Sequence, residues 1–152
     1  MSEVVEFGRA MNLLNLNRRR LIELAQIRQH DAKLLLKGRR YSGAYYLCGY
    51  VVECGLKACV AKQTHRHDFP DKDTVLGSYT HSLTQLVGIA GLKQELDNES
   101  VSDKSFEQNW AIVKEWKENS RYQKHTRQDA EALYEATANN KHGVMQWIRR
   151  HW

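Results

Sequence analysis

Proline is almost absent from this sequence, since Pro70 is the single example in 152 residues. Sustained alternation of polar and apolar residues, the pattern of strands, is also missing, whereas apolar residues recur at helical spacing along the chain. The chain contains no P-loop, no GxGxxG fingerprint and no GxSxG nucleophile elbow. These absences disfavour a sheet-based domain and the common nucleotide-cofactor and hydrolase motifs, and they favour an all-α protein.

Long apolar segments without charge are scarce as well. Within the apolar segment Tyr41–Ala61, the longest run free of charge is Tyr41–Val52, which is too short to span a bilayer. At the N-terminus, Glu3 and Glu6 precede the apolar residues and the arginines follow them, which is not the layout of a signal peptide. We therefore expect a cytoplasmic protein that does not contact a membrane.

Cysteine is rare, and Cys48, Cys54 and Cys59 all fall in the same apolar segment. On a helix they lie too far apart to bond to one another, and no CxxC pair is present. We interpret them as reduced core residues and expect neither a metal nor a cofactor. An intermolecular disulfide or a metal site is the less favoured alternative.

The overall composition is that of one soluble domain, with 41% apolar and 27% charged residues. Lysine and arginine number 23 against 18 acidic residues, so the net charge is +5 with histidine neutral. A basic surface of this kind suits an anionic partner such as a nucleic acid or a nucleotide.

Apolar periodicity and breaker residues divide the chain into helices. They predict long helices over 18–37 and 43–62, short ones over 81–90 and 91–98, and two further helices over 105–118 and 127–150. Residues 1–17 are expected to form an arm or a short helix, and residues 18–152 a single helical bundle.

Local signals mark several of these helix ends. Gly38 stands where the first helix would need a left-handed residue, and Ser42 is a plausible N-cap for the second. Thr80 can cap the helix over 81–90, and Thr126 with Asp129 resembles a capping box. The polar stretch between residues 63 and 80 reads as a loop, and its histidines and aspartates match no closed zinc site.

The apolar segment itself has two different faces on a helical wheel. One arc of roughly 80° collects small residues that allow close helix packing: Ala44, Cys48, Val52, Gly55 and Cys59. The opposite arc carries Tyr46, Tyr50, Glu53 and Lys57, with the two charges in the favourable i,i+4 order. The segment is therefore predicted to be a central helix with one amphipathic stripe.

The first long helix offers partners for that stripe. Arg28 projects from its apolar face and Asp31 lies at the edge of that face. Because an unpaired buried charge is costly, we expect Arg28 to pair with Glu53 and Asp31 to meet Lys57. Arg28→Ala would then cost roughly 3–5 kcal/mol if the pair is buried. Such a network would either fix the helix register, which we favour, or line a polar cleft that holds a ligand.

The same residues resemble a known family. The segment "RQHDAKLLLKGRRYSGAYYLCGYVVECGLKA", followed by "HSLTQLVGIAGL" and "WKENSRY", is similar to HEPN domains, named for higher eukaryotes and prokaryotes nucleotide-binding. The resemblance implies an up-and-down four-helix bundle with an additional short helix, commonly a homodimer. It also implies a role in toxin–antitoxin or defence systems beside a minimal nucleotidyltransferase. Many members are metal-independent endoribonucleases with an arginine and a histidine a few residues later.

The candidate site suggested by this resemblance is the basic connection before the last helix. Arg121 and His125 are the candidate catalytic residues, although fewer residues separate them than in the family motif, and Lys124 and Arg127 would join them in binding phosphate. His125 would act as acid or base and Arg121 would hold the phosphate, with an RNA 2′-hydroxyl as nucleophile. The non-functional alternative is that this basic segment is only a solvent-exposed connection between helices.

Three functions are therefore kept open. We favour a non-catalytic module that binds nucleotide or RNA, and the alternatives are a metal-independent endoribonuclease and a non-catalytic scaffold. His81 is interpreted as a capping or packing residue. The tryptophans Trp110, Trp116 and Trp147 are expected in the core or at an interface.

Overall fold

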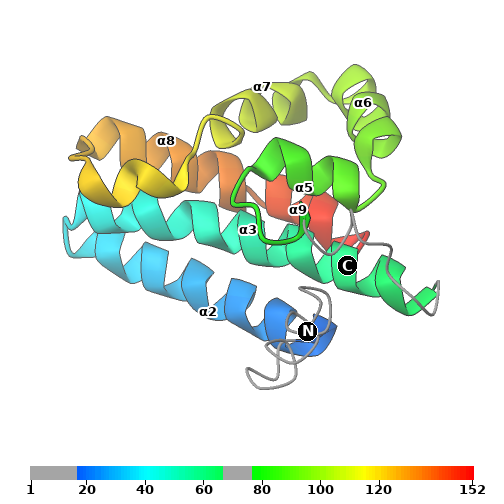
Figure 1. Ribbon diagram of the computed structural model, residues 1–152. Coiled ribbons are helices and arrows are strands. Elements are labelled where there is room, and N and C mark those ends of the chain that lie inside the picture. The colour runs from blue at the N-terminus through cyan, green and yellow to red at the C-terminus, as the bar shows by residue number, and fades with distance from the viewer. Residues whose placement is uncertain (1–16, 67–76) are drawn as a thin grey trace.

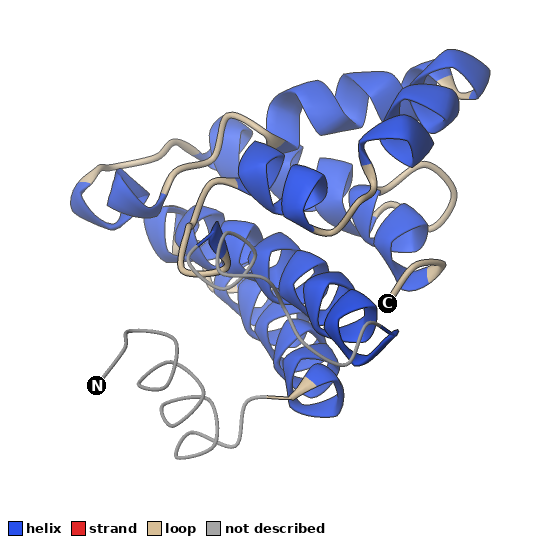
Figure 2. Cartoon of the chain, turned by 45° about the vertical axis from the view of Figure 1, so that its right-hand side comes forward, coloured by secondary structure: helices blue, strands red, loops and turns tan. Residues whose placement is uncertain are grey.

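The computed structural model describes residues 17–66 and 77–152, and these residues form helices and loops without a strand (Figure 2). The elements are α2 (Arg18–Lys37), α3 (Tyr41–Arg66), α5 (Leu83–Ile89), α6 (Lys93–Ser102), α7 (Lys104–Val113), the 3₁₀ helix η1 (Glu118–Tyr122), α8 (Arg127–Ala138) and α9 (Val144–Arg149). The prediction of an all-α fold is confirmed. The expected arm lies, apart from its last residue, outside the described residues, as does most of the polar loop.

The helices are arranged around α3. α2 lies along one side of α3, and α8 lies along another side with α7 beyond it, so that α2, α3, α8 and α7 make up the bundle (Figure 1). The short helices α5 and α9 and the 3₁₀ helix η1 close the remaining flanks of α3. None of the described helices combines the length and the apolar character that a bilayer span requires.

The faces of α3 follow the predicted pattern. Ala44, Cys48, Val52 and Cys59 are buried on the small-residue face, and Gly55 lies against Ile148 and Met145. On the opposite stripe Glu53 is buried, while Tyr46, Tyr50 and Lys57 are half-buried. The three tryptophans expected in the core are buried.

Two predicted helices end earlier than their periodicity suggested. The helix over 105–118 stops at Val113, and the last helix is broken between α8 and α9. At the break, the side-chain oxygen of Asn139 accepts hydrogen bonds from the backbone N–H groups of Lys141 and His142, which replaces the helical pattern. A Cβ on Gly143 would lie 2.4 Å from the carbonyl oxygen of Asn139, so this turn needs glycine.

The predicted N-cap is correct at one helix and wrong at two others. The capping box of Thr126 and Asp129 is present at α8 and is confirmed. Ser82, rather than Thr80, caps α5 by accepting a hydrogen bond from the N–H of Gln85. Ser42 lies inside the first turn of α3 and is not its N-cap.

The turn between α2 and α3 places the left-handed residue one position later than predicted. Gly38 has φ −80°, whereas Arg39 has φ 58°. The N–H of Arg39 bonds to Leu36 and that of Arg40 to Leu35, which is the Schellman pattern with Arg39 as its left-handed residue.

This geometry predicts that Arg39→Gly stabilises the protein by about 0.5–1 kcal/mol, since glycine adopts positive φ without the clash that costs other residues about 1–2 kcal/mol. Urea unfolding followed by circular dichroism would measure the change. Arg40→Gly is the matched control, because it removes the same charge from the same turn without relieving a positive φ. A lower free energy of unfolding for Arg39→Gly would contradict the prediction.

Candidate functional site

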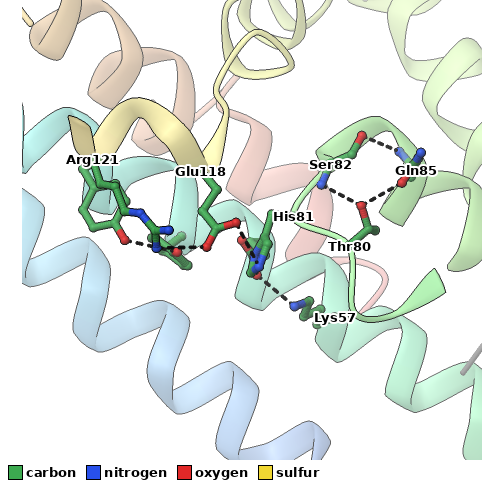
Figure 3. A network of polar contacts seen from close by, with 10 residues as sticks. Lys57, Thr80, His81, Ser82, Gln85, Glu118 and Arg121 are labelled. Carbon is green, nitrogen blue, oxygen red and sulfur yellow. Dashed lines mark hydrogen bonds and ion pairs between the residues drawn. The ribbon is translucent and has the colours of Figure 1, made fainter. Parts of the chain in front are cut away.

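Glu53 is the centre of the polar stripe on α3. Its side chain is only 5% exposed, and its Oε1 accepts a hydrogen bond from Lys57 Nζ at 2.8 Å. The same oxygen lies 2.9 Å from Nδ1 of His81, a residue that precedes α5 (Figure 3). Within the described residues, the second carboxylate oxygen of Glu53 is buried without a hydrogen-bond partner. A buried carboxylate thus holds a lysine and a histidine together.

The predicted ion pairs between α2 and α3 are wrong. Arg28 pairs with Asp31 on its own helix at 3.0 Å, and both side chains are about 40% exposed. Because Lys57 stands one turn after Glu53 on the same helix, it reaches that carboxylate without crossing between helices. Arg28 at the solvent edge needs no buried anion.

His81 extends the network from α3 to η1. Its Nε2 lies 3.1 Å from Glu118 Oε2, and Glu118 Oε1 accepts from Arg121 at 3.2 Å (Figure 3). Both ring nitrogens of His81 face carboxylate oxygens, so the imidazolium is the form that donates to both. The sequence interpretation of His81 as a capping or packing residue missed this role. Glu53, His81 and Glu118 are too far apart in sequence for any spacing pattern to connect them.

Aromatic rings support both ends of the network. The guanidinium of Arg121 lies 4.8 Å from the centre of the Tyr122 ring. Hydrogen bonding to Tyr122, and then to Tyr46 and the charge of Glu118, raises the pKa of Arg121 above its ordinary value. The hydroxyl groups of Tyr46 and Tyr50 share a hydrogen bond at 3.2 Å, and burial, followed by this contact, raises the pKa of Tyr50.

The basic connection between η1 and α8 is attached to the first turn of α3. The backbone N–H of His125 donates to Ser42 Oγ at 3.0 Å, and its ring stacks on Tyr45 with centroids 3.7 Å apart. Lys124 and Arg127 are exposed, and Arg127 donates to Glu131 at 2.7 Å. That contact is the main cause of the raised pKa of Arg127.

Arg121 and His125 have different partners in the structure. Arg121 is held by Glu118, whereas His125 is stacked on Tyr45. Within the described residues, Nε2 of His125 is buried and has no hydrogen-bond partner. The histidine that shares a carboxylate with Arg121 is His81, so the catalytic pairing of Arg121 with His125 stays a prediction.

Cations from two segments that are distant in sequence gather at one end of the bundle. The α2–α3 turn and the start of α8 lie at the same end, on the left of Figure 1. The exposed basic residues there are Lys37, Arg39, Arg40, Lys124 and Arg127. We call this set the basic end.

The cysteines and the acidic groups show no arrangement for metal chemistry in the part of the chain that the structure describes. The three thiols are free, and burial raises the pKa of Cys48 and Cys59 to about 12 and that of Cys54 to about 11. Across residues 17–66 and 77–152, no group of three or more His, Cys, Asp or Glu side chains is placed to hold a metal ion.

A separate hollow of about 400 Å³ lies at the other end of α3. Its lining includes Lys62, Gln63, Gly91, Glu95, Arg150 and His151. Its walls carry both signs of charge, so it is a weaker candidate for an anionic ligand than the basic end.

Comparison with known proteins gives no relative for this chain: no family model, no curated protein and no solved structure matches it. The similarity to HEPN domains therefore depends on the sequence segments alone.

Proposed function

We propose that this chain is a HEPN-type module that binds the phosphates of a nucleotide or RNA at its basic end. The observation that carries the proposal is the hydrogen bond from the N–H of His125 to Ser42, which holds the basic connection against the first turn of α3, next to the α2–α3 turn. Five exposed cations from two segments are thereby placed on one end of the bundle. The resemblance adds, as part of the proposal, a cytoplasmic homodimer that acts with a nucleotidyltransferase in a toxin–antitoxin or defence system.

The side chains of the basic end are suited to contact the phosphate backbone of a nucleic acid rather than to recognise its bases. Its cations are long, exposed side chains at a turn and at a helix start, which suits contact with phosphate oxygens. Of these, Arg127 is tied to Glu131, so it must exchange a partly exposed ion pair for phosphate. Exchange of this kind costs little, because exposed pairs contribute about 0–1 kcal/mol.

The endoribonuclease alternative draws no specific support from the positions of its two candidate residues. The His125 ring is covered on one face by Tyr45, and Arg121 is engaged by Glu118. Incubation with RNA in EDTA, beside His125→Ala, tests this alternative directly. Cleavage by the wild type that is absent in the variant would establish it.

We expect the double variant Lys124→Ala/Arg127→Ala to bind a short single-stranded RNA several-fold more weakly at low salt. The plot of log affinity against log salt concentration has a negative slope, and its magnitude should decrease by about 0.7 for each phosphate that the variant no longer neutralises. Fluorescence anisotropy of a labelled RNA over a series of salt concentrations measures both quantities.

The matched control is Arg19→Ala/Lys104→Ala. It also removes one arginine paired with a glutamate four residues on and one exposed lysine, but neither belongs to the basic end. An equal weakening in this control, or no salt-sensitive RNA binding by the wild type, would refute the proposal.

A further inference from the structure

We infer that His81 and Arg121 form a binding site for the dianionic phosphate group of a phosphate monoester, and that the carboxylate of Glu118 occupies this site as a built-in competitor. This site lies on the flank of α3, covered by η1, and it involves none of the residues of the basic end. It therefore stands independently of the proposed RNA contact.

The contacts of Glu118 have the form of anion recognition. One carboxylate oxygen faces an imidazole nitrogen at 3.1 Å, and the other accepts from a guanidinium nitrogen at 3.2 Å. Two oxygens of a phosphate group present a similar pair of acceptors, and imidazolium and guanidinium are the side-chain donors that suit them. The pair of donors that holds Glu118 can therefore hold a phosphate in the same way.

The two donors are held by groups other than Glu118. Nδ1 of His81 faces the buried carboxylate of Glu53 at 2.9 Å, which leaves Nε2 directed at the site. The guanidinium of Arg121 lies over the ring of Tyr122. Both donors thus keep their positions when the carboxylate of Glu118 turns away.

Charge balance favours a dianion over a single carboxylate. With His81 protonated, Lys57, His81 and Arg121 each contribute +1 and Glu53 contributes −1, so the site without Glu118 carries +2. Glu118 neutralises one of these charges. A phosphate monoester, which carries about two negative charges near neutral pH, neutralises both, whereas a phosphodiester carries one.

The competitor is able to leave at low cost. The side chain of Glu118 is 30% exposed, and Glu118 is the first residue of a short 3₁₀ helix with no side-chain cap. Rotation about its side-chain bonds into water frees both donors without unwinding the backbone. Partly exposed ion pairs of this type are weak, so a phosphate competes with Glu118 on favourable terms.

The test is titration of the full chain with inorganic phosphate and with a nucleoside monophosphate at constant ionic strength. The imidazole NMR signals of His81 and isothermal calorimetry would report binding. We expect Glu118→Gln to bind both probes about tenfold more tightly than the wild type, because the variant removes a like charge beside a dianion. Arg121→Gln should abolish the response of the His81 signals to both probes while keeping the wild-type melting temperature.

Glu23→Gln is the matched control, because it removes the carboxylate of another arginine–glutamate pair that includes no histidine and lies outside the basic end. It should leave the phosphate affinity and the His81 signals unchanged. Equal tightening in both glutamine variants would show a general charge effect and overturn the inference. The inference would also be overturned if the folded Glu118→Gln protein bound no more tightly than the wild type, or if Arg121→Gln left the response of the His81 signals unchanged. The RNA affinity of the Lys124→Ala/Arg127→Ala protein is read separately and tests only the basic end.

Discussion

Gly49→Ala is expected to lower the free energy of unfolding by about 3 kcal/mol, at the upper end of the usual cost of overpacking. A Cβ at position 49 would lie 1.8 Å from Cε2 of Trp116, inside the van der Waals radius of the ring. The indole of Trp116 is buried and rigid, so it has no free space into which to move. Either α3 shifts or the tryptophan leaves its position.

The effect of Gly49→Ala should extend to the candidate site, because Trp116 lies two residues before η1 and packs edge-on against Tyr50 with ring centroids 5.2 Å apart. Displacement of the indole should move Glu118 and Arg121, and the phosphate affinity expected at His81 should fall with it. Urea unfolding and the phosphate titration measure the two effects.

Gly88→Ala is the control for Gly49→Ala. Gly88 also lies in a helix, but a Cβ there would meet nothing within 4 Å. Alanine at this exposed position should stabilise α5 by about 0.5–1 kcal/mol. The low end of overpacking costs is about 1 kcal/mol. If the free energy of unfolding of Gly49→Ala lies within that amount of the wild-type value, the close packing of Trp116 on α3 is wrong.

Lys57→Met is expected to destabilise the protein by about 3 kcal/mol, because it leaves the buried carboxylate of Glu53 without its lysine and with only the His81 imidazole beside it among the described residues. Methionine keeps the length and the apolar stem of lysine, so packing changes little. The free energy of unfolding in urea gives the magnitude.

Arg28→Met is the control for this prediction. It breaks a pair whose two side chains are about 40% exposed, so its cost should be below about 1 kcal/mol. The double variant Glu53→Leu/Lys57→Met should be less destabilised than Lys57→Met alone, because no carboxylate remains buried. Equal destabilisation by Lys57→Met and Arg28→Met would show that Glu53 is not the buried centre of the network.

The features that the sequence determined by itself are local ones. The bounds of α2 and the capping box of Thr126 and Asp129 follow from interactions between residues a few positions apart. The faces of α3 follow from helical periodicity, which also predicted the close pairing of Glu53 with Lys57 on one stripe. Interactions of this range are encoded in spacing, so a single sequence is enough to predict them.

Tertiary structure decided which distant residues meet, and a single sequence has no spacing rule for that. Arg28 and His81 both had the chemistry to pair with Glu53, yet only His81 does so, because the segment before α5 covers the stripe of α3 while Arg28 lies at a solvent edge. The same packing turned Glu118 toward His81 and stacked His125 on Tyr45, and it thereby gave different partners to the two residues that the sequence had paired as a catalytic site. The burial of Glu53 is the physical reason for this pairing, because a buried carboxylate needs cationic partners and pairs with those that the fold brings within reach.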